Sequence, residues 1–170
     1  MRADGSSKFG KNNKYGYFPS VGAKWAISNE ELLTPITVIS NLGWRASWGI
    51  TGNQEFPAGA SKEQISVNPY NSINASVTAN PNLKWESTKQ FDAGIDFALV
   101  NGRVNGSIDY YNRNTSDLLF STVAIQPAPG GTIYLNLANA HLINSGVEAF
   151  VAVTLVQNKK INWEVTGNVA

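Results

Sequence analysis

The protein is a chain of 170 residues with a formal net charge of +1, no cysteine and a single histidine, His141. A charge balance this close to neutral gives no electrostatic basis for binding nucleic acid. The lack of cysteine excludes disulfides, thiolate nucleophiles and cysteine-ligated metals. One histidine argues against a histidine-based metal site or a Ser-His-Asp triad. We therefore expect neither an enzyme nor a cofactor-dependent protein.

Six segments of the chain largely alternate apolar and polar residues, and this period of two places each set on one face of a β-strand. Residues 1–14 are polar and are predicted to form a loop. The first predicted strand covers 15–28, although Pro19 weakens the expectation of unbroken pairing. The second covers about 38–51 and alternates most cleanly, with Leu, Trp, Ala, Trp and Ile on one face. The other predicted strands are 85–100, 103–114, about 141–156 and 161–170.

Short and long connectors alternate between these strands. Asn101-Gly102 is the strongest short hairpin signal and predicts a type I′ turn. Two long polar loops are predicted at about 53–84 and 115–140. Outer-membrane barrels show this asymmetry, with short periplasmic turns and long external loops.

The composition also favours a membrane barrel over a soluble domain. Charged residues make up only 15% of the chain, against roughly 25% in a typical soluble domain. The central positions of the apolar faces carry no charge, as expected where a lipid-facing Lys or Arg costs roughly 2–4 kcal/mol. The pattern predicts an all-β fold, an antiparallel meander of about six strands in the wall of a transmembrane β-barrel.

The alternation assigns candidate residues to each face. Polar-face charges predicted to line the lumen are Arg45, Asp92, Asp96, Asp109 and Glu148. Apolar-face aromatics predicted at the two membrane interfaces, where amphipathic rings are favoured, are Tyr15, Tyr17, Trp25, Trp44, Phe91, Phe97, Tyr110 and Trp163. Tyr70 and Trp85 fall in or beside a long external loop and are candidates for contact with a ligand or partner at the outer rim.

A catalytic interpretation of the polar face is weak. Asp92 and Asp96 are four residues apart on one strand, which separates their Cα atoms by about 13 Å. Inverting glycosidases hold their carboxyl groups about 6.5–9.5 Å apart. A polar lining of the lumen explains the two carboxylates better.

Several segments resemble one protein family in order and register. They include Trp44-Arg45-Ala46-Ser47-Trp48-Gly49-Ile50-Thr51-Gly52-Asn53-Gln54, together with 2–10, 15–20, 80–86, 101–111 and 115–119. In these segments the chain is similar to the SusC/RagA-type TonB-linked outer-membrane transporters of Bacteroidota. The resemblance covers nearly the whole chain.

The resemblance implies a 22-stranded barrel with an N-terminal plug and a TonB-contacting segment, in the outer membrane of a Gram-negative cell. It also implies import of oligosaccharide or peptide with a SusD-like lipoprotein and the TonB system. The N-terminus lacks the apolar segment of a signal peptide. We therefore expect residues 1–170 to be part of the C-terminal barrel domain, without plug, TonB box or signal peptide, and unable to transport alone. The alternative is a secreted β-sandwich adhesin or glycan-binding module.

Overall fold

The computed structural model describes residues 1–31, 36–67, 73–125 and 131–170. Contacts divide the chain into two compact units. Unit 1 comprises Met1–Pro19, Ile50–Lys89 and Asn114–Ile143, and unit 2 comprises Ser20–Gly49, Gln90–Arg113 and Asn144–Ala170. Four long strands contribute residues to both units: β4 (Ile39–Asn53), β7 (Glu86–Leu99), β8 (Val104–Val123) and β9 (Thr132–Gln157).

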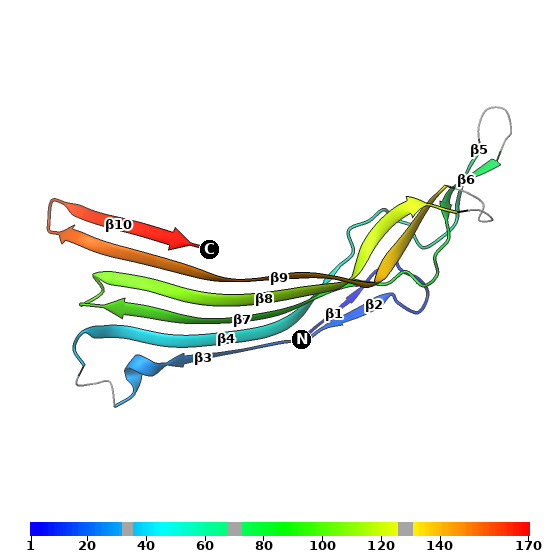
Figure 1. Ribbon diagram of the computed structural model, residues 1–170. Helices are drawn as coiled ribbons and strands as arrows, with labels where there is room; N and C mark the ends of the chain where they lie inside the picture. Colours follow the sequence, from blue (N-terminus) through cyan, green and yellow to red (C-terminus); the bar gives the residue numbers. More distant parts are fainter. Residues whose placement is uncertain (32–35, 68–72, 126–130) are drawn as a thin grey trace. The chain divides into compact units, whose positions relative to one another are not determined.

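Unit 2 is a single layer of six strands. It adds β3 (Ser20–Ala26) and β10 (Asn162–Val169) to the four long strands, and a 3₁₀ turn, η1 (Ile27–Asn29), follows β3. The strands are ordered β3-β4-β7-β8-β9, and β10 pairs with β9. Neighbouring strands alternate in direction (Figure 1). The predicted all-β meander of six strands is confirmed.

The short connector between β7 and β8 has the predicted turn chemistry. Asn101 and Gly102 have φ angles of 55° and 79°, and the N–H of Arg103 donates to the carbonyl oxygen of Val100 at 3.2 Å. Two central residues at positive φ are what a type I′ turn requires. Val100 precedes them with a φ of 54°, which is unusual for a β-branched residue.

Unit 1 contains short strands that the alternation did not predict. β1 (Arg2–Gly5) pairs with β2 (Tyr15–Phe18) in a separate two-stranded sheet, so the predicted loop at 1–14 is wrong for residues 2–5. β2 ends directly before Pro19, and the strand that follows Pro19, β3, pairs with β4 in the larger sheet. The break expected at Pro19 is therefore confirmed.

The two predicted long loops also contain strands. The loop at 53–84 contains β5 (Gln64–Val67) and β6 (Ile73–Thr78). β5 and β6 pair antiparallel, and β6 pairs parallel with β9. The loop at 115–140 is wrong over most of its length, because β8 continues to Val123 and β9 begins at Thr132. Three consecutive apolar residues at 118–120 hide the strand period there.

Unit 1 is built around an aromatic core. Its buried members are Phe9, Phe18, Phe56, Ala60, Leu83 and Trp85. Asparagine side chains form hydrogen bonds that connect the segment 80–85 to β9. Asn80 Nδ2 donates to the carbonyl oxygen of Tyr134 at 2.7 Å, and Asn136 exchanges two hydrogen bonds with the backbone of Lys84 at 2.8 and 2.9 Å.

Within the described residues, we find no helix with the length and apolar character needed to cross a bilayer.

Candidate functional site: a two-faced sheet

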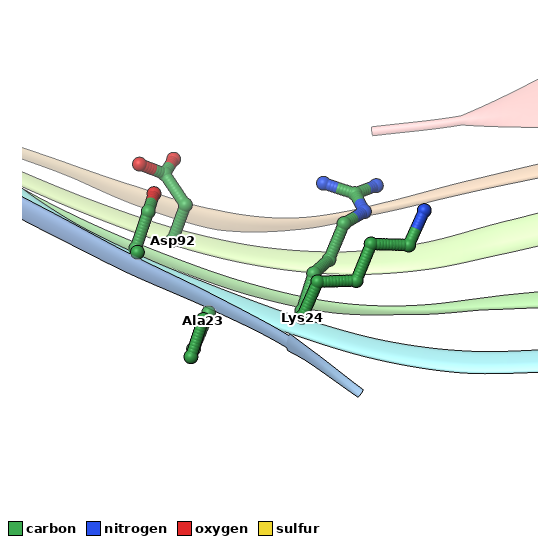
Figure 2. Close-up of a pocket in the computed structure, with 7 residues that line it drawn as sticks. Ala23, Lys24 and Asp92 are labelled. Carbon is green, nitrogen blue, oxygen red and sulfur yellow. The ribbon is translucent and has the colours of Figure 1, made fainter. Parts of the chain in front are cut away.

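The register between β3 and β4 sorts their side chains onto two faces. Apolar residues stand opposite one another in the pairs Val21↔Trp48, Ala23↔Ala46 and Trp25↔Trp44. The intervening pairs are Lys24↔Arg45 and Gly22↔Ser47. Figure 2 shows Lys24 and Asp92 on one side of the sheet and Ala23 on the other. The strands of unit 2 thus present one apolar face and one polar face, as the alternation predicts.

The apolar face is broad and open. Trp25 is 54% exposed, Ile95 44% and Val165 48%. Val165 stands opposite Val153 in the β9–β10 register, so the face continues to the last strand. A sheet that packed this face in a dry core would leave these side chains almost fully buried.

A charge cluster crosses three strands on the polar face. Arg45 Nε, on β4, lies 3.2 Å from Asp96 Oδ2 on β7, and Arg45 Nη2 lies 2.6 Å from Asp109 Oδ1 on β8. Gly94 makes room for this contact, because a Cβ atom at position 94 would overlap the carboxylate of Asp109. The structure therefore brings together three of the five predicted lumen residues.

Asp92 borders a neighbouring hollow. A cavity of about 290 Å³ has a lining that includes Lys24, Arg45, Ser47 and Asp92. Figure 2 labels Lys24 and Asp92 among its lining residues. Gln90 Nε2 donates to Asp92 Oδ2 at 2.7 Å. Sequence reasoning did not select Lys24, although it shares the even-numbered, polar face of β3. Its even position in β3 was the sequence signal, and the register with β4 places Lys24 directly opposite Arg45.

Glu148 lies on the same face, near the free edge of unit 2. It lines a cavity of about 140 Å³ with Ser107, Asp109 and Asn168. Among the described residues, no group of three or more His, Cys, Asp or Glu side chains is placed to hold a metal ion.

Of the two residues predicted at the outer rim, Trp85 lies within the described residues. Trp85 is only 8% exposed and stacks on Phe9 with a centroid distance of 4.6 Å, and its contact with a ligand or partner stays a prediction. Phe9 and Phe18, far from Trp85 in the chain, contact its ring, and Phe56 packs on Phe9 in the same cluster. Tyr70 lies outside the described residues.

The predicted interface aromatics lie in both units. Tyr15 and Tyr17, 72% and 63% exposed, are on β2 and pair with β1. The other six lie in unit 2: Trp25, Trp44, Phe91, Phe97, Tyr110 and Trp163. Phe97 is partly buried because its ring covers Gly106, where a Cβ atom would meet it. Their placement at a membrane interface stays a prediction.

A six-stranded sheet with an open apolar face and a charged opposite face is typical of the wall of a membrane β-barrel. A family model described as "TonB dependent receptor-like, beta-barrel" matches residues 1–170. The chain belongs to this family, and within it to the SusC/RagA type.

Relatives and solved structures agree with this assignment. TonB-dependent receptor SusC from Bacteroides thetaiotaomicron is 35% identical over 99% of this chain and 18% of its own length. TonB-dependent receptor P3 from Formosa agariphila is 34% identical over 98% of this chain and 17% of its own length. A structure of the RagAB peptide transporter superposes with a TM-score of 0.85 at 30% identity, covering 98% of this chain and 19% of that one. The chain thus spans less than one fifth of the length of these relatives.

Proposed function

We propose that this chain forms part of the wall of an outer-membrane, TonB-dependent transporter that imports oligosaccharide or peptide with a SusD-like lipoprotein. The observation that carries the proposal is the two-faced sheet of unit 2. SusC is a TonB-dependent receptor, and RagAB is a peptide transporter. These names support energised import, and we infer the same transport role for the protein to which this chain belongs.

The two faces have complementary roles in this proposal. The apolar face with Ile95 and Val165 meets lipid, which needs no second layer of protein. The face with Arg45, Asp96 and Asp109 lines a water-filled lumen, where partly exposed ion pairs keep their hydration. The exposed interface aromatics mark the edges of the apolar band. No catalytic step is assigned to the chain.

The alternative, a secreted β-sandwich module, fits the same strands less well. A sandwich packs two sheets face to face, about 10 Å apart, and buries the inner side chains of both. The large apolar side chains of unit 2 instead remain close to half exposed. The free edges of β3 and β10 also need neighbours, which the next strands of a barrel would supply.

Two adjacent positions on β4 provide the sharpest test. Ala46 stands on the apolar face opposite Ala23, and Ser47 on the polar face opposite Gly22. In the complete transporter, Ala46→Lys places a charge in lipid at a cost of roughly 2–4 kcal/mol near the midplane. Ser47→Lys instead places its charge on the polar face, which also carries Lys24 and Arg45.

We expect Ala46→Lys to reduce the amount of heat-modifiable barrel in isolated outer membranes by at least severalfold. Ser47→Lys should leave that amount close to the wild-type level. The two variants share strand, depth and new side chain, so they differ only in the face. Equal tolerance of both changes would remove the basis of the proposal.

The partner and the cargo need a separate measurement. We expect the complete transporter to copurify with a SusD-like lipoprotein and to support growth on an oligosaccharide or peptide that its deletion strain cannot use. A complete transporter that assembles but does neither would restrict the proposal to the barrel itself.

A further inference from the structure

A cavity of about 310 Å³ in unit 1 lies outside the polar face described above. Its lining includes Glu55, Phe56, Phe120, Ser121 and Tyr134. The rings of Phe56 and Tyr134 lie 6.3 Å apart at an interplanar angle of 26°. Phe120 is 50% exposed, whereas Phe56 is buried at 9%. The cavity therefore has a buried aromatic base, an exposed aromatic ring and one carboxylate.

The two walls of the cavity are held together by Glu86. Its Oε1 accepts a hydrogen bond from Asn53 Nδ2 at 3.1 Å, and its Oε2 accepts one from the backbone N–H of Leu119 at 3.0 Å. A tight turn follows Asn53, whose Oδ1 accepts from the N–H of Glu55 at 3.0 Å. Glu86 thus ties the segment that carries Glu55 and Phe56 to β8, so the cavity is preorganised.

The chemistry of the lining favours a cation. Lys8, which does not line the cavity, has its Nζ 5.9 Å from the centroid of Phe56, so an ammonium group already lies near this ring. Lys8 Nζ also donates to the carbonyl oxygen of Gln54 at 3.4 Å. Among the described residues, the carboxylate of Glu55 forms no salt bridge. Aromatic rings beside an unpaired carboxylate complement a guest with an apolar stem and a positive end.

We propose that this cavity binds a lysine or arginine side chain of a peptide cargo. The proposal rests on the proposed transport function and narrows its cargo. The aliphatic stem of the guest packs against Phe120, and its charged end pairs with Glu55. A neutral sugar would use the same rings but would gain nothing from the charge of Glu55.

The test uses the purified complete transporter in detergent and two synthetic pentapeptides, identical except for lysine or norleucine at the central position. Isothermal titration calorimetry measures both dissociation constants. We expect the wild type to bind the lysine peptide about tenfold more tightly, given the usual strength of cation–aromatic and ion-pair contacts. Glu55→Gln should abolish this preference, and Phe120→Ala should weaken both peptides.

Glu63→Gln is the matched control, because Glu63 is an exposed carboxylate of unit 1 that does not line the cavity. It should retain the lysine preference. Equal affinity of the two peptides, no measurable binding of either, or a preference that survives Glu55→Gln would overturn the inference. Binding of a neutral oligosaccharide that depends on Phe120 and not on Glu55 would also overturn it.

Failure of this inference is distinguishable from failure of the proposed function. The comparison of Ala46→Lys with Ser47→Lys reports assembly of the barrel without any cargo. If those two variants differ as expected and the peptides show no lysine preference, only the cavity proposal falls. If the two variants assemble equally well, the transport function itself is contradicted.

Discussion

The carboxylate of Asp109 lies over the backbone of Gly94, in the space that any side chain at position 94 would occupy. From there, Asp109 Oδ1 reaches Arg45 Nη2 at 2.6 Å. The glycine therefore allows a charge contact between strands β4 and β8, which are not neighbours in the sheet. Gly94 is a requirement of the polar face, although it carries no functional group.

Gly94→Ala should destabilise the complete transporter by about 1–3 kcal/mol, as overpacking of a filled site commonly does. The new methyl group displaces Asp109 and breaks its contact with Arg45. The measurement is the midpoint of urea unfolding in detergent, with circular dichroism as the signal. Gly22→Ala is the control, because its Cβ would meet only ordinary contacts at 3.6 and 3.7 Å. Equal midpoints for the two variants would contradict this account of Gly94.

The ion pair between Arg45 and Asp109 should make a modest contribution to stability. Their side chains are 42% and 26% exposed, so water screens the interaction. A double-mutant cycle with Arg45→Met and Asp109→Asn should give a coupling free energy of about 1 kcal/mol or less. The coupling should shrink as salt is added. A coupling that stays constant up to 1 M salt would show that the pair is effectively buried.

Trp85 should be a major source of stability in unit 1. Trp85→Ala removes the ring that stacks on Phe9 and meets Phe18 edge-on at 5.4 Å, and should cost about 3–5 kcal/mol. Trp85 Nε1 is buried and, among the described residues, has no hydrogen-bond partner. Trp85→Phe removes this unpaired donor and keeps an aromatic ring. It should cost at least 2 kcal/mol less than alanine. Comparable unfolding midpoints for the two variants would exclude the packing explanation.

The turn between β7 and β8 should carry backbone strain at Val100. A β-branched residue at a φ of 54° lies in the left-handed region, which costs a non-glycine residue roughly 1–2 kcal/mol. Asparagine tolerates this region better, so Val100→Asn should raise stability by about 0.5–1 kcal/mol. Gly102→Ala should lower the stability by about 1 kcal/mol, because Gly102 has a φ of 79°. The space around Gly102 is open, so the backbone conformation alone causes this loss. A Val100→Asn variant less stable than the wild type would refute strain at this position.

The sequence by itself determined the strands of unit 2 and their two faces. A period of two is a property of the extended backbone, so Trp44 and Arg45 fall on opposite faces whichever strands lie beside them. The turn at Asn101-Gly102 was equally predictable, because type I′ turns strongly prefer Asn and Gly at their two central positions. The family followed from segments in register along nearly the whole chain.

Only the tertiary structure decided which residues meet. The contact between Arg45 and Asp109 depends on strand order and register, which the alternation of a single strand does not contain. The extension of β8 to Val123 depends on backbone hydrogen bonds to neighbouring strands, which form without alternating side chains. Trp85 is buried because Phe9 and Phe18 converge on it from distant segments. Burial is a property of that convergence, and a local sequence pattern carries no record of it.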